Sequence, residues 1–411
     1  MRILISGASI AGPVLAYWLH RYGFDVTVVE HSPQLRKAGG HAVDLFRPAM
    51  DISEKMGVLA AIEARITGME RIELRRPGKR RPVVMNLAKI FGATSDRHVE
   101  IMRDDLGEIY YDATRADVEY VFGDSVTSIG EDGTVTFERG APRRFDLVVG
   151  ADGLHSNVRR LVFGDESACT AYVGAYLAVA SVPKDLGVPG ESIMYNAPGR
   201  GVGVGGPAHL DDARLVFLFR SERRLDVHHR DVEGQKAVLR KVFAGMEPQV
   251  DRWLTELDRA PAFYFDSITQ LRMDTWSRGR VTLVGDAGYC PGPAVGGSTS
   301  LAVIGAYVLA GELAAAGGDH ERAFAAYERE MAGIVRDSRA FALGAAKVLI
   351  PRSRLGLWAL MQGVRLIGAL PTGLSRALAK LNDKGVRLHD SMRIKDYPAP
   401  RSVRGTTSPD S

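Results

Sequence analysis

A short glycine-rich segment near the N-terminus carries residues suited to binding a phosphate-bearing ligand. GASIAG begins at Gly7, follows the apolar run RILIS and precedes apolar residues at helical spacing. In such a turn Gly7 permits a tight bend and Gly12 permits close packing of helix on strand. The free N–H groups of the helix N-terminus then face a pyrophosphate. The middle of the turn is Ser9, Ile10 and Ala11, with Ser9 where a further glycine is usual. The chemistry indicated is dinucleotide binding.

A carboxylate lies where a second nucleotide contact is expected. Glu30 ends the apolar run VTVVE, 18 residues beyond Gly12. There a carboxylate accepts hydrogen bonds from the adenosine ribose, and its charge favours a ribose without a 2′-phosphate, as in FAD or NAD. The alternative interpretation is an ordinary turn with a solvated glutamate. These residues do not distinguish FAD from NAD.

A second glycine-rich loop stands far along the chain. Asp286 follows the apolar run RVTLVG, and Pro293, Gly296 and Gly297 lie in the loop that leads to a long apolar helix. Asp286 is placed to accept a hydrogen bond from a polyol such as ribityl, and the helix N-terminus favours negative charge on a bound ring. A glycine-rich connection with a capping aspartate is the alternative.

The elements around these loops indicate the fold. Residues 2–6 and 26–30 have the composition of buried strands, and 10–22 has helical spacing between them. Strand, glycine turn, helix and strand open a βαβ unit. We therefore expect an α/β fold in which a Rossmann-like dinucleotide-binding domain carries an inserted, mainly antiparallel β-sheet domain and a C-terminal helical segment.

Changes of pattern along the chain set the expected domain boundaries. GRGVGVGG, at 199–206, is expected to be a sheet edge or a flexible hairpin. The expected divisions are the dinucleotide-binding domain at 1–71, 103–166 and 277–331, the inserted domain at 72–102 and 167–276, C-terminal helices at 332–390, and a disordered tail at 391–411.

Composition excludes several classes of function. With 53 Lys and Arg against 49 Asp and Glu, the formal net charge is +4, which is too balanced to indicate nucleic-acid binding. Cys169 and Cys290 lack the spacing of a disulfide framework or a metal site, so we expect no metal and a reducing compartment. No stretch of about 18 uninterrupted apolar residues occurs, so no spanning helix is expected. We expect a cytoplasmic monomer or homodimer.

The C-terminal region is unusually basic. From Arg339 onward the chain has 13 Lys and Arg against 4 Asp and Glu, and residues 348–371 are apolar with spaced arginines. One interpretation is a helix at a membrane surface or against a lipophilic substrate. The other is a helix packed across both domains with its basic face in water. We expect the second, and therefore no membrane contact.

Three separated motifs together resemble the class A flavoprotein monooxygenases, whose fold is that of para-hydroxybenzoate hydroxylase. They are GASIAG with Glu30, DLVVGADGLHSNVRR, and GDAGYCPGPAVGG. The resemblance implies that the dinucleotide-binding domain is a Rossmann-like FAD-binding domain, that the inserted domain is the substrate domain, and that FAD is bound tightly but non-covalently. It also implies that Asp152 and Gly153 help to hold FAD and organise nicotinamide binding, that Asp286 meets the ribityl chain, and that Arg103 touches the flavin.

Within that class, the length and the GGHAVDL stretch are similar to the tetracycline-inactivating monooxygenases. This likeness implies that Asp44 contacts FAD and that Arg36, or Lys37, meets NADPH. Besides Ser9, the chain departs from the class at Tyr289, where histidine is frequent, and at Gly305, where aspartate is common.

The resemblance implies a reaction as well. NADPH or NADH reduces FAD, O₂ forms a C4a-hydroperoxyflavin, and oxygen is transferred to a small organic substrate of aromatic, polyketide or antibiotic-like character. The flavin carries this chemistry, so no catalytic side chain is nominated. A flavin-dependent reductase or dehydrogenase, or a non-catalytic flavin-binding protein, remains an alternative.

Overall fold

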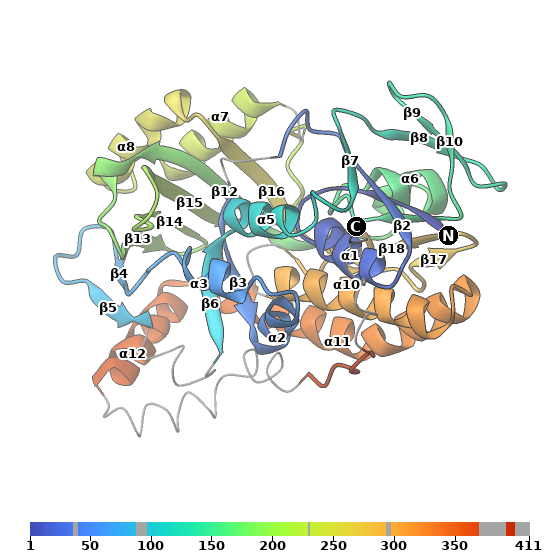
Figure 1. The fold of residues 1–411 in the computed structure, drawn as a ribbon. Helices are drawn as coiled ribbons and strands as arrows, with labels where there is room; N and C mark the ends of the chain where they lie inside the picture. The colour runs from blue at the N-terminus through green and yellow to red at the C-terminus, as the bar shows by residue number, and fades with distance from the viewer. Residues whose placement is uncertain (36–39, 88–96, 229–230, 293–296, 370–391, 399–411) are drawn as a thin grey trace, which may run out of the picture.

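Two large β-sheets lie next to each other in the computed structural model of the protein (Figure 1). A six-stranded sheet holds the N-terminus, and a seven-stranded sheet forms the other half of the molecule. The structure describes residues 1–35, 40–87, 97–228, 231–292, 297–369 and 392–398.

The six-stranded sheet has the order β17-β18-β11-β1-β2-β7, and all its neighbours pair in parallel except β17 with β18. Ile3, Leu4 and Ile5 of β1 are fully buried because helices and loops cover both faces of a parallel sheet. Its strands are β1 (Arg2–Ser6), β2 (Asp25–Glu30), β7 (Glu119–Phe122), β11 (Leu147–Gly150), β17 (Ser277–Arg278) and β18 (Val281–Leu283).

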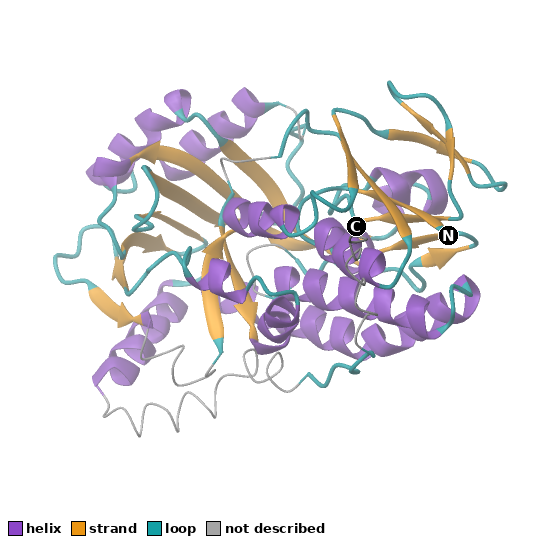
Figure 2. Cartoon of the chain, in the orientation of Figure 1, coloured by secondary structure: helices purple, strands orange, loops and turns teal. Residues whose placement is uncertain are grey.

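Helices cover this sheet, with α1 packed on α10 and α10 packed on α11 (Figure 2). Among the described residues only α10 is long and apolar enough to cross a membrane, and 78% of it is buried inside the protein, as in a core helix. The helices of this half are α1 (Ala11–Arg21), α2 (Arg47–Lys55), α3 (Leu59–Glu63), α5 (Arg103–Asp112), α6 (Asn157–Phe163), α9 (Asp286–Tyr289), α10 (Ser298–Ala315) and α11 (His320–Leu349).

The seven-stranded sheet has the order β16-β12-β15-β14-β13-β4-β5 and is antiparallel except between β13 and β4. Helices α7 and α8 cover one face, where Phe217, Phe243 and Trp253 are buried in a separate core. Its elements are β4 (Arg71–Arg75), β5 (Val83–Asn86), β12 (Thr170–Pro183), β13 (Glu191–Ala197), β14 (Arg200–Gly205), β15 (Asp212–Arg220), β16 (Phe263–Leu271), α7 (Val232–Phe243), α8 (Pro248–Thr255), and the 3₁₀ turns η1 (Glu166–Ala168), η2 (Lys184–Leu186) and η3 (Glu256–Arg259).

The chain enters this second sheet twice, once with β4 and β5 and again from β12 to β16. Of two smaller sheets, β3 paired to β6 lies between the halves, whereas β8, β9 and β10 form a three-stranded unit at the outer end of the six-stranded side (Figure 1). The expected α/β fold with a Rossmann-like domain is confirmed. The smaller strands are β3 (Ala42–Phe46), β6 (His98–Met102), β8 (Val126–Ile129), β9 (Thr134–Phe137) and β10 (Arg143–Arg144).

The GRGVGVGG segment differs from both structures expected for it. It forms β14, an interior strand between β13 and β15. A Cβ on Gly203 would lie 2.5 Å from the carbonyl oxygen of Ile193, so the small residue lets two strands approach closely.

The C-terminal region is helical to Ala369, with α12 (Arg354–Ala369) following α11. Residues 392–398 differ from the predicted disordered tail because they lie against α10. Tyr397 is buried, and its hydroxyl donates to Glu312 at 2.7 Å. Its ring lies against Gly311, where a Cβ would be 2.3 Å from the ring, so docking requires glycine there.

Candidate cofactor site

The turn between β1 and α1 is held in a shape that only glycine allows. Gly7 has φ of 110°, and a Cβ on it would lie 2.5 Å from the carbonyl oxygen of Ala151. A Cβ on Gly12 would lie 1.9 Å from the carbonyl oxygen of Gly7. Ile10 and Ala11 are buried beneath the turn. The turn therefore leaves the N-terminus of α1 open toward a neighbouring cavity, as a pyrophosphate requires.

That cavity has a volume of about 910 Å³, within the range of roughly 300–1,000 Å³ typical of cofactor and ligand sites. The structure brings part of the predicted set together around it: the predicted residues in its wall are Gly7, Ser9, Glu30, Arg103, Asp152 and Gly153. Sequence reasoning missed further polar residues that share the wall, namely Ser32, Asp124, Thr127, His155, Asn157 and Arg160.

Glu30 joins the two turns at the carboxyl ends of β1 and β2. Its Oε2 accepts from the backbone N–H of Ala8 at 2.8 Å, and its Oε1 accepts from that of Ser32 at 2.9 Å. Each carboxylate oxygen has a further lone pair, so Glu30 can still accept from ribose hydroxyls. Its position fits the predicted nucleotide contact.

Arg103 explains the serine in the glycine turn. Its Nη2 donates to Ser9 Oγ at 3.0 Å, and its backbone N–H donates to the carbonyl of His41 at 3.1 Å. Burial, with the Arg103 charge adding to it, lowers the pKa of His41 to about 4, so this ring is neutral at neutral pH. Arg103 thus places a positive charge beside the turn, where an anionic cofactor would lie.

Asp152 organises the loop that closes the cavity. Its Oδ2 accepts from the backbone N–H groups of Asn157 at 2.9 Å and Val158 at 3.0 Å, and Ser156 Oγ donates to its Oδ1. Burial raises the pKa of this carboxyl above its usual range. Gly153 follows with φ of 80°. The carboxylate is therefore engaged by the loop, which in turn presents its backbone to the cavity.

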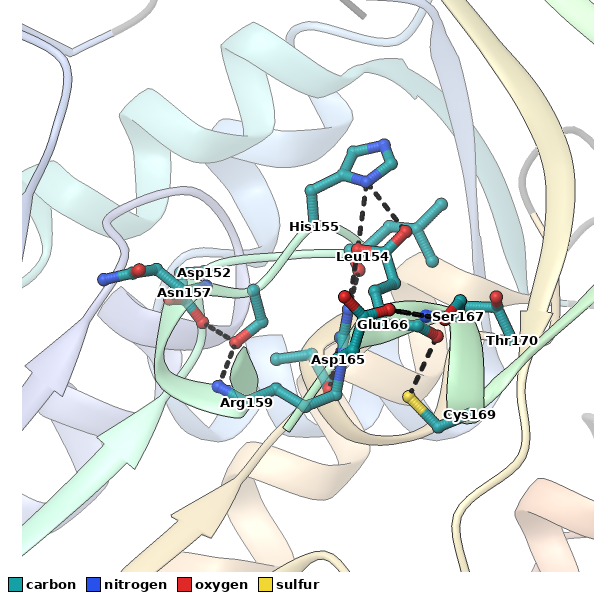
Figure 3. Close-up of polar contacts among 12 residues, drawn as sticks. Asp152, Leu154, His155, Asn157, Arg159, Asp165, Glu166, Ser167, Cys169 and Thr170 are labelled. Carbon is teal, nitrogen blue, oxygen red and sulfur yellow. Dashed lines mark hydrogen bonds and ion pairs between the residues drawn. The ribbon is translucent and has the colours of Figure 1, made fainter. Parts of the chain in front are cut away.

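A cluster next to this loop was missed in the sequence (Figure 3). His155 contacts Glu166 through Nδ1 at 3.1 Å and Asp266 of β16 through Nε2 at 3.1 Å. Hydrogen bonds to Asp266 and Glu166 raise the pKa of His155 to about 10, so the ring is cationic. Buried Arg159 also pairs with Glu166 at 3.0 Å. The cluster ties the cofactor-side loop to the seven-stranded sheet.

Three other predicted residues lie outside the wall of this cavity. Asp286 begins α9 and accepts from Ser298 Oγ, while Gly297, with φ of 90°, precedes α10. Asp44 Oδ1 is 2.8 Å from His98 Nε2. Their proposed contacts with FAD stay predictions. The predicted residues that fall outside the described part of the chain are Arg36, Pro293 and Gly296.

Comparison with known proteins identifies the cofactor. The family model described as "FAD binding domain" matches residues 1–342. The glycine turn, the cationic Arg103 and the Glu30 carboxylate fit this dinucleotide, so the family match and the geometry agree.

Relatives give the same assignment. A flavin-dependent monooxygenase of Legionella longbeachae is 37% identical over 83% of this chain and 87% of its own length. An uncharacterized protein of Mycobacterium tuberculosis is 43% identical over 81% of this chain and 90% of its own. The crystal structure of tetracycline destructase Tet(51) is 31% identical, with a TM-score of 0.79 over 96% of this chain and 99% of that one. The chain therefore belongs to the family of FAD-dependent monooxygenases that carry this FAD-binding domain.

Proposed function

We propose that the protein is an NAD(P)H-driven monooxygenase that hydroxylates a small organic substrate bound between the cofactor cavity and the seven-stranded sheet. The observation that carries this proposal is the position of Arg103. Its side chain contacts Ser9 of the glycine turn, and its charge acts on both His41 and Tyr264, a residue of β16. The cofactor cavity and the seven-stranded sheet therefore meet at the guanidinium group of Arg103.

Beside the Arg103 charge lie two polar side chains that are uncharged at neutral pH, those of His41 and Tyr264. The rings of His41 and Tyr264 lie 5.7 Å apart, centroid to centroid. Burial raises the pKa of the Tyr264 hydroxyl above its usual range, while the pKa of His41 is lowered. Neutral hydrogen-bonding groups of this kind suit a phenol, an enol or a polyketide.

Gly40, in the loop before β3, is hydrogen-bonded to the seven-stranded sheet. Arg214 of β15 donates from Nε to the carbonyl of Gly40 at 3.2 Å, and Gly40 N–H donates to Asp104 at 2.6 Å. These contacts join both halves of the molecule around the proposed substrate space.

The chemistry that bound FAD would supply is electron transfer from NAD(P)H and activation of O₂. The protein's own residues would hold and orient FAD and the reductant. The α1 N-terminus would bind the pyrophosphate, Glu30 the ribose and Arg103 the flavin side. Asp286 would meet the ribityl chain, Asp44 would contact FAD from the β3 side, and Arg36 would meet the reductant. Similarity to a tetracycline destructase makes tetracyclines one substrate candidate beside other polyketides and phenols.

The test is a visible absorption spectrum followed by NADPH and NADH consumption across phenols, polyketides and tetracyclines. We expect flavin bands, and one compound that accelerates oxidation and gains an oxygen atom from ¹⁸O₂. Tyr264→Phe should slow this substrate-stimulated rate. Tyr172→Phe, at a tyrosine of β12 that donates to Ser221, should not. A yellow protein whose NAD(P)H oxidation no compound changes, with no labelled product, would overturn the proposal.

A further inference from the structure

Helix α12 is fixed against the edge of the seven-stranded sheet. Leu357 and Met361 form a small buried cluster with Val83 of β5. Just before the helix, the carbonyl of Pro351 accepts from Gly199 N–H at 2.8 Å, and that of Ile350 accepts from Arg220 Nε at 2.6 Å. The helix therefore has a defined inner face and a defined outer face.

The outer face carries large apolar side chains. Leu355, Trp358 and Leu366 are 73%, 49% and 60% exposed, and their spacing places them on one side of the helix. Val348 and Leu349, at the end of α11, are also exposed. An exposed apolar surface of this kind marks an interaction site. We call the exposed side chains of residues 348–366 the α12 face.

Positive charge accompanies the α12 face. Residues 338–369 contain five Lys and Arg and no Asp or Glu. Strand β5 packs on α12, and the turn that precedes β5, at the same end of the molecule, adds exposed Lys79, Arg80 and Arg81 (Figure 1). Glu247 is near this turn, where its carboxylate accepts from Gly78 N–H at 3.0 Å. Within the described ranges none of these three basic residues, nor Arg354 or Arg365, forms an ion pair.

We propose that the α12 face docks on an anionic phospholipid bilayer. Leu355, Trp358 and Leu366 would enter the headgroup boundary, and Arg354 and Arg365 would lie beside lipid phosphates. Tryptophan favours that boundary, because its ring is apolar while its N–H needs a polar partner. Two segments far apart in sequence contribute charge of the same sign to one end of the molecule. This site is independent of the proposed oxidation chemistry, and it revises the expectation that the C-terminal helix avoids membranes.

Trp358 makes the proposal directly measurable. The other three tryptophans, Trp18, Trp253 and Trp276, are buried. With the FAD-loaded protein, vesicles of phosphatidylcholine and phosphatidylglycerol should shift the tryptophan emission to shorter wavelength and carry the protein into the pellet. Pure phosphatidylcholine should do so far less. Trp358→Phe should keep most of the binding and lose the spectral shift.

Substitutions on the α12 face distinguish lipid docking from other occupants. Arg354→Glu and Arg365→Glu should each weaken vesicle binding at least about fivefold, because each removes a contact worth about that factor and adds repulsion. Leu355→Ser with Leu366→Ser should abolish binding. Val232→Ser and Lys241→Glu, exposed on α7, are matched controls that should change nothing. FAD content should be unchanged in all variants.

Three outcomes would overturn the proposal. One is no pelleting with anionic vesicles at low salt. Another is binding that Val232→Ser or Lys241→Glu weakens as much as the α12 variants do. A third is a dimer in light scattering that Leu355→Ser with Leu366→Ser dissociates, without any vesicle binding by the original protein, because a second copy would then cover the face.

Discussion

Two glycine-rich segments of this protein look alike in sequence and differ in purpose. In the turn between β1 and α1, Gly7 and Gly12 lie against backbone carbonyls, and the bend leaves a helix N-terminus open to the cavity. In β14, Gly203 also lies against a backbone carbonyl, that of Ile193, but protein strands pair with β14 on both sides. Glycine indicates close approach of backbone in both places. The position of the segment in the fold decides whether this close approach makes room for a ligand or packs two strands of a sheet together.

The largest effect should come from Gly12→Ala. A Cβ there would lie 1.9 Å from the carbonyl oxygen of Gly7, and no side-chain rotation relieves a backbone overlap. We predict a loss of more than about 3 kcal/mol in the free energy of unfolding. We also predict an at least tenfold lower flavin occupancy, measured as the flavin-to-protein absorbance ratio after desalting. Gly344→Ala is the control, since a Cβ meets nothing within 4 Å and the residue lies in α11. Full flavin occupancy in Gly12→Ala would contradict the proposed cradle.

Gly203→Ala should have the second largest effect. It should lower stability without weakening FAD binding, and so distinguish the role of β14 from that of the glycine turn. Its Cβ would lie 2.5 Å from the Ile193 carbonyl oxygen, so β13 and β14 must move apart. We predict a loss of about 2–3 kcal/mol in the free energy of unfolding. The FAD dissociation constant should stay within about twofold, because β14 forms no part of the cofactor cavity wall. A variant that keeps its stability but loses FAD would reverse the comparison.

Signals within one short segment were enough to predict part of the site. Gly7 and Glu30 line the cavity, and each could be found from a local pattern, that of a glycine turn and that of a strand end. Arg103 also lines it, but it was expected only from the resemblance to the monooxygenase family. His155 was missed because its partner Asp266 is 111 positions away. The interior position of β14 and the docked segment at 392–398 were missed for the same reason. Strand order and the contact of a tyrosine with a distant glycine are tertiary facts that local propensity does not contain.

Gly305→Ala should have a smaller effect, which a second substitution can relieve. Its Cβ would lie 1.8 Å from the Tyr289 hydroxyl, which is the end of a side chain rather than backbone. The two departures from the family pattern thus fit each other, since the tyrosine occupies space that glycine leaves free. We predict a loss of about 1–2 kcal/mol for Gly305→Ala alone.

The matched measurement is a double-mutant cycle with Tyr289→Phe. The phenylalanine lacks the oxygen that clashes, although it also loses the hydrogen bond to Tyr327 at 3.0 Å. Gly305→Ala should cost at least about 1 kcal/mol less in this background, measured by urea unfolding. Strictly additive costs would mean that the Tyr289 hydroxyl is not what requires glycine at 305.

The smallest predicted effect concerns His155, which links the cofactor half of the molecule, with its glycine turn, to the seven-stranded sheet that contains β14. His155 lies in the loop beside the cofactor cavity and reaches Asp266 of the seven-stranded sheet. Its pKa is raised to about 10 in the folded protein, whereas it is about 6.5 in an unfolded chain. The contribution of the charged ring is therefore complete below pH 6.5, declines between pH 6.5 and 10, and is absent above pH 10. The side chain is 51% exposed, so solvent screening keeps this contribution below about 1 kcal/mol.

His155→Gln should therefore be less stable than the original protein at pH 6 and equally stable above pH 10, with a flatter decline between. His320→Gln, at the start of α11, should follow the original profile. Thermal unfolding across this pH range, followed by flavin fluorescence and by circular dichroism, measures both halves. If His155 couples them, the two signals should separate in the variant at pH 6, because flavin release then no longer requires the sheet to unfold. Superimposed signals in every variant would mean that the broad packing between the halves, and not this imidazolium, makes them unfold together.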